Sequence, residues 1–274
     1  MAKVWFVTGS SRGLGRAIVE EALKSGAHVI ATARNLESLN HLAEKFSTSN
    51  FLPLTLDVTC ETDVQKAIEI GNAKFGRIDV VVNNAGYANL AAIEDINTDD
   101  FRTQMDTNFM GVVYTTKAVL PILRQQRSGH IFQVSSIGGR VGTPGLCAYQ
   151  SAKWAVGGFS TILAQEMAPF GVKVTILEPG AMKTDWAGPS MKIPTISKPY
   201  EPTVGSVAEM LRNWSSKELM IPEKVAQMMI KLAGADVAPV RLLIGAEAVD
   251  YATQAAQALA ESDAKWEKLS VSVI

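Results

Sequence analysis

Short apolar runs alternate along the chain with longer stretches in which apolar residues recur every three or four positions. Runs of the first kind are typical of β-strands, and the second pattern is typical of amphipathic helices. The sequence predicts strands at residues 4–8, 28–33, 51–58, 79–84, 130–135, 173–178 and 241–244. It predicts helices at residues 14–25, 36–46, 61–75, 99–126, 147–169 and 246–268.

Strands that alternate with helices in this way form a parallel sheet with helices on both faces. Val80, Val81 and Val82 are consecutive apolar residues, which suits a strand buried on both faces. The pattern therefore predicts an α/β fold, a doubly wound parallel sheet of about seven strands in one domain spanning 1–274. The alanine-rich helix at 246–268 is expected to pack on this domain or to form a subunit contact.

The alternation stops between Pro179 and Pro222. A stretch this long without a regular pattern is usually functional or disordered. Its content of aromatic residues and methionine argues against a disordered linker. We therefore predict a substrate-binding lid over residues 181–221, with short helices near 204–213. Its prolines and its large side chains are Pro189, Pro194, Pro199, Pro202, Trp186, Met191, Tyr200 and Trp214.

The composition is that of an ordinary globular protein, 47% hydrophobic with a formal net charge of −1. This charge gives no reason to expect nucleic acid or an anionic membrane surface as a partner. The apolar runs are too short to span a bilayer, and the amino-terminal run reads as a strand rather than a signal peptide. We expect a cytoplasmic protein. Two cysteines and three scattered histidines predict neither a disulfide nor a metal site.

A glycine-rich loop joins the first predicted strand to the first helix, with Gly9, Gly13 and Gly15 spaced Gly-x-x-x-Gly-x-Gly. Glycines at this place permit a tight turn and let a pyrophosphate approach the backbone, and the helix N-terminus offers free N–H groups. The spacing differs from the usual Gly-x-Gly-x-x-Gly, and such turns also serve structure alone. The position after an amino-terminal strand favours dinucleotide binding.

The end of the second predicted strand distinguishes NADP from NAD. A carboxylate there would bind the ribose 2′-hydroxyl and repel a 2′-phosphate. The sequence instead has Arg34, with no carboxylate before Glu37, and Arg12 lies in the glycine loop. Both guanidinium groups can pair with a phosphate, so NADP(H) is the predicted cofactor. The alternative is that both arginines are solvated surface charges.

Further motifs resemble the short-chain dehydrogenase/reductase family over residues 3–184, with a looser likeness in the remaining third. In chain order they are the loop Thr8 to Gly15, Asn83-Asn84-Ala85-Gly86, Asn108, Ser136, Tyr149 and Lys153 with three residues between them, Pro179-Gly180, and Thr184. The resemblance implies a Rossmann fold and a carbonyl–alcohol oxidoreductase. The lid segment also loosely resembles that of carbonyl reductases and relatives of 17β-hydroxysteroid dehydrogenases, which points to a bulky apolar ketone.

The chemistry of three residues agrees with this resemblance. Tyr149 and Lys153 are four apart on a predicted helix and so share one face. A nearby ammonium favours phenolate, so we expect Lys153 to lower the pKa of Tyr149 toward neutrality. Ser136 follows the fifth predicted strand, at the sheet edge where ligands bind, and its hydroxyl can donate to a carbonyl oxygen. The family's spacing selects Ser136 over Ser135.

Other roles come from the resemblance alone. Asn108 would hold a water that relays protons to Lys153, or it could instead only bend its helix. Asn83 could only brace the strands. Lys153 would also hold the nicotinamide ribose. The cofactor set it implies is Gly9, Ser11, Arg12, Gly13, Leu14, Gly15, Arg34, Asp57, Val58, Asn84, Ala85, Gly86, Tyr149, Lys153, Pro179, Gly180 and Thr184.

The substrate is expected to be a small-molecule carbonyl compound or alcohol that contacts Ser136 and Tyr149, with lid-side walls from Leu146, Trp186, Met191 and Tyr200. Enoyl reduction is set aside, because relatives with that activity have six residues between tyrosine and lysine. A catalytically silent NADPH sensor or scaffold is a second hypothesis, although such relatives commonly lose the tyrosine or the lysine. The family often pairs through its two long helices, here 99–126 and 147–169, which predicts a homodimer or homotetramer.

Overall fold

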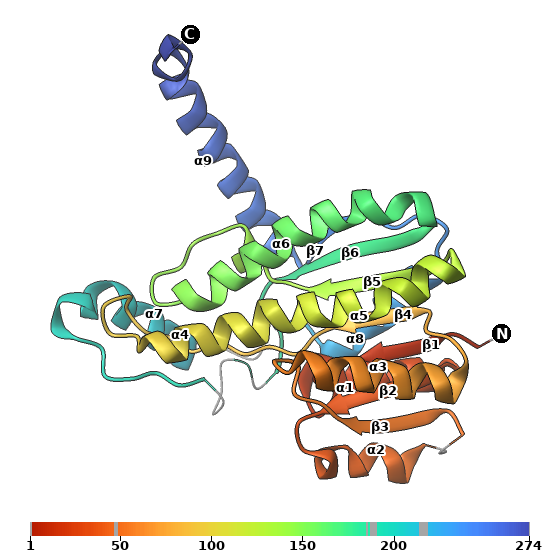
Figure 1. Cartoon of the computed structure of the whole chain (residues 1–274). Helices are drawn as coiled ribbons and strands as arrows, with labels where there is room; N and C mark the ends of the chain where they lie inside the picture. The colour runs from red at the N-terminus through yellow and green to blue at the C-terminus, as the bar shows by residue number, and fades with distance from the viewer. Residues whose placement is uncertain (1, 47–48, 185, 187–190, 214–218, 274) are drawn as a thin grey trace.

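A computed structural model describes residues 2–46, 49–184, 186, 191–213 and 219–273. In this part of the chain seven strands form one sheet in the order β3-β2-β1-β4-β5-β6-β7, and every neighbouring pair is parallel. Helices cover both faces of the sheet (Figure 1). The predicted doubly wound α/β fold, the Rossmann fold, is therefore confirmed as a single domain.

The strands are β1 Val4–Val7, β2 His28–Ala33, β3 Phe51–Thr55, β4 Val80–Asn83, β5 Gly129–Val134, β6 Val172–Pro179 and β7 Arg241–Ile244. The helices are α1 Gly13–Lys24, α2 Asn40–Lys45, α3 Glu61–Phe75, α4 Thr98–Met105, α5 Gly111–Gln126, α6 Cys147–Met167, α7 Ser206–Arg212, α8 Pro222–Gly234 and α9 Ala246–Ser270.

The sheet separates two apolar cores. Successive side chains of a strand point to opposite faces, so in β1 Trp5 and Val7 enter the core under α1 and α8. Val4 and Phe6 enter the other core, under α3, α5 and α6. All four side chains are almost fully buried, which explains why the central strands read as continuous apolar runs.

Several predicted bounds need correction. The strand predicted at 51–58 ends at Thr55, because the chain turns at Asp57, whose carboxylate accepts hydrogen bonds from the N–H and hydroxyl of Thr59. The helix predicted at 36–46 begins as a 3₁₀ turn over Leu36–Leu39, with Asn35 as its cap. The helix predicted at 99–126 is interrupted by a π-helical turn over Asp106–Met110.

One helix was missed, and a second packs on the domain only near its beginning. The sequence interpretation missed α8, although Pro222 is in the first turn, where proline is favoured, and Val225, Met229 and Ala233 recur at helical spacing. It also expected the helix at 246–268 to pack on the domain or a partner. Only Ala248 and Ala252 of α9 are buried, and the rest of the helix projects away from the domain (Figure 1).

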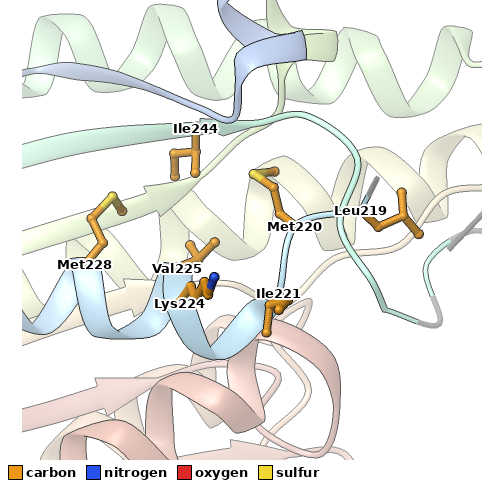
Figure 2. A pocket seen from close by; sticks show the side chains of 7 residues that line it. All are labelled: Leu219, Met220, Ile221, Lys224, Val225, Met228 and Ile244. Carbon is orange, nitrogen blue, oxygen red and sulfur yellow. The ribbon is translucent and has the colours of Figure 1, made fainter. Parts of the chain in front are cut away.

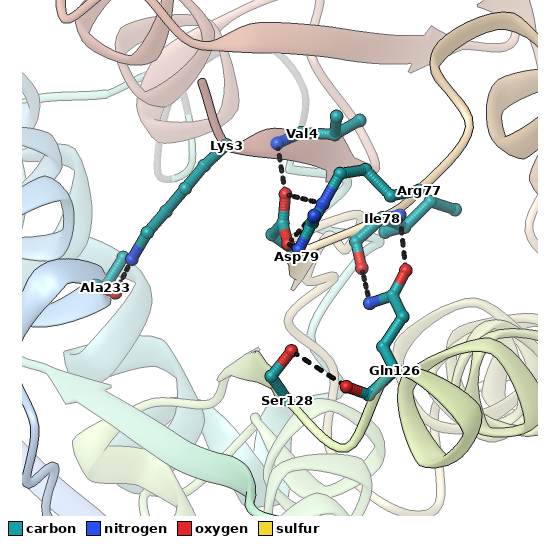
Figure 3. A network of polar contacts seen from close by, with 8 residues as sticks. All are labelled: Lys3, Val4, Arg77, Ile78, Asp79, Gln126, Ser128 and Ala233. Atoms are coloured by element: carbon teal, nitrogen blue, oxygen red, sulfur yellow. Dashed lines mark hydrogen bonds and ion pairs between the residues drawn. The ribbon is translucent and has the colours of Figure 1, made fainter. Parts of the chain in front are cut away.

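A network of polar contacts lies at the amino ends of the strands, at the end of the sheet opposite the glycine loop (Figure 3). Asp79 accepts hydrogen bonds from the Val4 N–H at 2.8 Å and from the Arg77 guanidinium. The Gln126 amide exchanges two hydrogen bonds with the Ile78 backbone, at 3.2 and 2.7 Å. Lys3 donates to the Ala233 carbonyl at the end of α8, where a cation stabilises the helix dipole.

His130 lies buried at the same end of the sheet. Its Nε2 is 2.9 Å from the hydroxyl oxygen of Thr175, and that hydroxyl donates to the Pro239 carbonyl at 2.7 Å. His130 therefore donates from Nε2 and is neutral. Burial lowers the pKa of His130 to about 3, helped by the positive charges of Lys173 and Lys3.

This burial predicts a pH-dependent stability. Below pH 6.5 the unfolded chain protonates His130, while the folded chain keeps it neutral until about pH 3, so stability falls as the pH falls. His130→Gln keeps a donor for Thr175 and removes the titration. Between pH 7 and pH 5 the native protein should lose about 2 kcal/mol more unfolding free energy than the variant. Urea denaturation of both proteins at the two pH values measures this, and equal losses would show that His130 does not titrate on unfolding.

Candidate active site

The glycine-rich loop makes a tight turn between β1 and α1. Gly9 and Gly13 have positive φ angles of 67° and 55°, which favour glycine. A Cβ atom on Gly15 would lie 2.2 Å from the Gly9 carbonyl oxygen, so only glycine permits this approach. Arg12 at the N-cap makes no side-chain cap, which leaves the first N–H groups of α1 to a ligand. The loop thus forms a cradle for an anion.

Asn84 holds this loop from the neighbouring strand end. Its Nδ2 donates to the carbonyl oxygens of Thr8 and Gly9 at 2.9 and 3.0 Å. The Thr8 hydroxyl oxygen accepts from the N–H groups of Asn84 and Ala85. The preceding Asn83 donates to Gln133 of β5 and so braces strands, in agreement with the structural interpretation of that residue.

Thr184 also reaches the cradle from far along the chain. Its methyl carbon lies 3.4 Å from the position that a Cβ on Gly13 would occupy. Pro179 ends β6, and the Gly180 N–H donates to the Ile244 carbonyl of β7 at 3.1 Å. The structure therefore brings residues that follow β6 to the glycine loop, as the resemblance implied.

The two arginines that favour NADP(H) are both exposed. Arg34 directly follows β2, and the Ser10 N–H of the glycine loop donates to Thr32 of that strand at 2.9 Å, which joins the two segments. Neither Arg12 nor Arg34 has an ion pair in the described chain. Burial and the charge of Asp100 raise the pKa of Tyr87, and the charge of Arg34 partly opposes them, so Arg34 also lies near Tyr87.

The remaining residues expected around the adenine lie at the end of β3. Asp57 is exposed, and Val58 is buried against α5, where a Cβ on Gly111 would lie 2.7 Å from a Val58 methyl carbon. Val58 therefore packs in the core. Asp57 keeps its carboxylate at the surface on the carboxyl side of the sheet.

Ser136, Tyr149 and Lys153 meet at the carboxyl ends of β5 and β6. Ser136 follows β5 and caps a 3₁₀ turn, with its Oγ accepting from the Gly138 N–H at 3.0 Å. Tyr149 lies in the first turn of α6, near enough to the Ser136 hydroxyl for that group to lower the pKa of the phenol. Lys153 lies one turn later, where its Nζ donates to the Val134 carbonyl at 2.7 Å and is 5.6 Å from the centre of the Tyr149 ring.

The expected effect of Lys153 on Tyr149 needs correction. Burial raises the pKa of Tyr149 to about 12, against a smaller lowering by the hydrogen bond with Ser136. Burial also lowers the pKa of Lys153 to about 8. Desolvation disfavours the charged form of each group and is the largest cause of both shifts. Tyr149 is therefore a neutral phenol that keeps its proton at pH 7.

Asn108 lies in the π-helical turn between α4 and α5 and is fully buried. Its Oδ1 accepts from the Tyr87 N–H at 2.9 Å, and its Nδ2 donates to the Tyr87 carbonyl at 2.8 Å. A Cβ on Gly86 would lie 2.7 Å from Asn108 Oδ1 and 3.6 Å from Lys153 Nζ, so Asn108 is near the lysine. The side chain braces the loop after β4, and the proton relay stays a prediction.

An apolar cluster covers Tyr149. The Trp186 ring is tilted by 58° to the Tyr149 ring with 5.2 Å between centroids, and Tyr149 is only 7% exposed. Leu146 and Met191 are buried in the same cluster, and Tyr200 packs against it, so the four predicted wall residues do come together. Other members that sequence reasoning did not select are Ala88, Leu90, Ala92, Val204, Ala208 and Leu211.

The predicted lid is fastened to the loop after β4. Leu90 N–H donates to the Lys192 carbonyl at 3.0 Å, and the Lys192 N–H donates to Asn89 Oδ1 at 3.2 Å. The Ser197 N–H donates to the Asp95 carboxylate at 2.9 Å. The expected short helices are confirmed as a π turn over Glu201–Gly205 followed by α7. Pro189 and Trp214 lie outside the described residues.

The end of the lid segment that leads into α8 borders a groove (Figure 2). Met220 forms a bridge with Met182 and exchanges backbone hydrogen bonds with Ala181 and Lys183. Beside it lies a groove of about 290 Å³ between α8 and β7. Its walls are Leu219, Met220, Ile221, Lys224, Val225, Met228 and Ile244, none of which belongs to the cluster around Tyr149.

Sequence reasoning missed a buried ionic group beside the site. Glu178 is 1% exposed and accepts from Arg140 at 2.6 Å and from Arg241 at 2.8 Å. Arg140 ends the turn that begins at Ser136, and Glu178 directly precedes Pro179. The three charges therefore join the serine turn, β6 and β7. The only sequence signal was a single acidic residue at the end of an apolar strand.

The described residues contain no helix long and apolar enough to cross a membrane. They also contain no group of three histidine, cysteine, aspartate or glutamate side chains placed to hold a metal ion.

Known protein sequences match this chain over most of its length. A family model described as short chain dehydrogenase matches residues 3–192. The oxidoreductase BOA17 of Botryotinia fuckeliana is 61% identical over 271 residues, which cover 99% of both chains.

Solved structures agree with the sequence matches. A short-chain dehydrogenase from Streptomyces avermitilis superposes with a TM-score of 0.93 at 34% identity, covering 100% of this chain, α9 included, and 98% of that one. An alcohol dehydrogenase from Thermococcus sibiricus complexed with 5-hydroxy-NADP has a TM-score of 0.74 at 26% identity, covering 89% and 96%. ElxO with NADP bound has a TM-score of 0.76 at 28% identity, covering 91% and 100%.

Proposed function

Because the chain belongs to the short-chain dehydrogenase/reductase family and is an oxidoreductase, we propose that it is an NADP(H)-dependent carbonyl reductase. Its substrate would be a bulky apolar ketone or aldehyde, with oxidation of the secondary alcohol as the reverse reaction. One arrangement carries the proposal: the Tyr149 phenol lies buried near Ser136 and next to Lys153, beneath an apolar cover.

The residues around the glycine loop fit a dinucleotide. Gly9 and Gly15 let the loop pack closely against Ala85 and Asn84, where a Cβ atom would overlap protein atoms, and α1 presents uncapped N–H groups there. Arg12 and Arg34 are available to a 2′-phosphate, and Thr184 lies at the other side of the loop. Two similar structures contain NADP or an NADP derivative. NADPH would supply the hydride, and the protein would supply orientation and a proton.

The protein's own part in reduction follows from the three buried groups. Ser136 and Tyr149 would donate hydrogen bonds to the substrate carbonyl oxygen, which stabilises the negative charge that develops there. Tyr149 would then transfer its proton to that oxygen. The resulting phenolate would be stabilised by the Lys153 ammonium, because the two groups lie one helical turn apart in a site that excludes water. The apolar cluster around Tyr149 favours a substrate with a large apolar group next to its carbonyl.

Assembly through the long helices is also proposed. Trp154 and Ile162 of α6 are 55% and 60% exposed. With Gly158 between them they are spaced four residues apart and so form one stripe along the helix. Burying this stripe against the same helices of a second copy would form a homodimer or homotetramer. Trp154→Glu should lower the mass measured by light scattering at micromolar concentration. A native protein that is monomeric there would contradict the assembly.

The cofactor preference gives a direct test. Arg34→Asp replaces a cation with a carboxylate that repels the 2′-phosphate, so NADPH affinity should fall by about tenfold to a hundredfold, or 1.5–3 kcal/mol. NADH lacks this phosphate and serves as the internal control, since its affinity should change little. Fluorescence titration of both cofactors measures the effect. A native enzyme that uses NADH as efficiently as NADPH would contradict the assignment.

The catalytic assignment is tested by removing single groups. Tyr149→Phe should reduce turnover by about a hundredfold to ten-thousandfold, because the proton donor is lost. Ser136→Ala should lower the rate with little change in NADPH affinity, because its hydroxyl meets the substrate. Lys153→Met should harm both, because the lysine also holds the nicotinamide ribose in the proposed complex.

The measurement is paired, with NADPH binding followed by fluorescence and ketone turnover by absorbance. Tyr251→Phe, which deletes the same hydroxyl on exposed α9, is the matched control and should keep full turnover. Near-native turnover of Tyr149→Phe would refute the proton donor. A native protein that binds NADPH but reduces nothing in a panel of ketones, aldehydes and steroids would favour the sensor hypothesis.

A further inference from the structure

Helix α9 extends far beyond the domain that it leaves (Figure 1). Its 25 residues measure about 37 Å at 1.5 Å per residue. Only Ala248 and Ala252, near its beginning, are buried. Every residue from 256 to 273 is exposed, including three large apolar side chains: Leu259 at 64%, Trp266 at 54% and Leu269 at 64%.

The large apolar residues in the outer part of α9 follow a heptad pattern. Spacings of four and three alternate along one stripe, which we call the α9 seam: Ala248, Ala252, Ala255, Leu259, Ser262, Trp266 and Leu269. The seam contains no charged residue, and Val273 continues the spacing in the terminal 3₁₀ turn. Alternation of this kind over three heptads is typical of a helix that packs along another helix.

The seam is covered at its base and open beyond it. Ala248 and Ala252 pack on the domain, while the same stripe continues outward without cover. A helix without tertiary contacts is marginal in water, because most helical stability in proteins comes from packing an apolar face. The outer part of α9 therefore needs a partner that buries Leu259, Trp266 and Leu269.

We propose that this partner is α9 of a second copy of the chain, in an antiparallel pair related by a two-fold axis. Two-fold pairing needs a self-complementary surface, and the seam is one. An antiparallel overlap over 255–273 places Trp266 opposite Ser262, Leu259 opposite Leu269, and Ala255 opposite Val273. In this register the large Trp266 faces the small Ser262, and Leu259 faces another leucine, Leu269. The two domains then lie at opposite ends of the helix pair.

A parallel pair would instead bring the two Trp266 rings together in one layer and the two Ser262 hydroxyls together in another. The antiparallel pair uses the exposed residues from 256 to 273 together with the half-buried Ala255. It buries fewer residues than the roughly 20 to 30 per side of a standard interface. We therefore expect it to join pre-formed dimers or to associate more strongly as concentration rises.

The test uses charges placed on opposite sides of α9. Leu259→Glu combined with Trp266→Glu should halve the mass found by light scattering at micromolar concentration. Ala264→Glu adds the same charge to the exposed opposite face and should keep the native mass. Turnover with NADPH and a ketone, or far-ultraviolet circular dichroism if the protein turns nothing over, shows that the domain is folded in all variants. The proposal is overturned if the double variant keeps the native mass, if Ala264→Glu lowers it equally, or if the native protein is monomeric.

Disulfide trapping tests the direction of the pair. In a background with Cys60→Ser and Cys147→Ser, a mixture of Leu259→Cys and Leu269→Cys chains should crosslink to each other. Neither variant alone should crosslink with itself, because equal positions of an antiparallel pair lie about ten residues, or about 15 Å, apart along the axis. Self-crosslinking of Leu259→Cys would overturn the antiparallel arrangement.

Discussion

Tyr149 and Lys153 are buried one helical turn apart, and burial opposes the charged form of each group. The phenol stays protonated, and the ammonium keeps its proton at pH 7 with a pKa of about 8. The lysine is held by the Val134 carbonyl at the end of β5, and the phenol by Ser136, two residues later. The chemistry of the site therefore depends on how the end of β5 is positioned against the first turns of α6.

The parallel sheet explains how distant residues reach this register. The carboxyl ends of β1, β4, β5 and β6 meet at one edge, so the glycine loop, Asn84, Ser136 and Pro179 become neighbours. Asn84 ties its own strand end to the glycine loop, and Glu178 with its two arginines ties the serine turn to β6 and β7. These polar links hold the loops that would position a cofactor beside Tyr149.

Local patterns predicted this framework well. Apolar runs such as Val80 to Val82 identified the buried strands, and the spacing of Tyr149 and Lys153 placed both on one face of a helix. Ser136 and Thr184 were placed by resemblance, and the structure brings both to the expected edge of the sheet. The wall residues Leu146, Trp186 and Met191 were chosen only for their size, and they do pack around Tyr149.

Properties that depend on three-dimensional surroundings could not be predicted in this way. The charge of Lys153 suggested a lower pKa for Tyr149, but burial, which a sequence does not display, reverses the direction. The π turn at Asn108 and the ion group around Glu178 depend on contacts between distant segments. The helix at 246–268 was predicted, but how little of it packs on the domain was not, because its alanines suit a buried face and an exposed helix equally.

Hydride transfer to a carbonyl carbon is the central claim of this account, and isotope transfer tests it most directly. NADPH carrying deuterium at C4 of the nicotinamide, prepared separately in its two stereochemical forms, is incubated with the enzyme and a bulky apolar ketone. The account predicts that one of the two forms places deuterium on the carbinol carbon of the alcohol, as detected by mass spectrometry. An alcohol formed without deuterium from either form would contradict it.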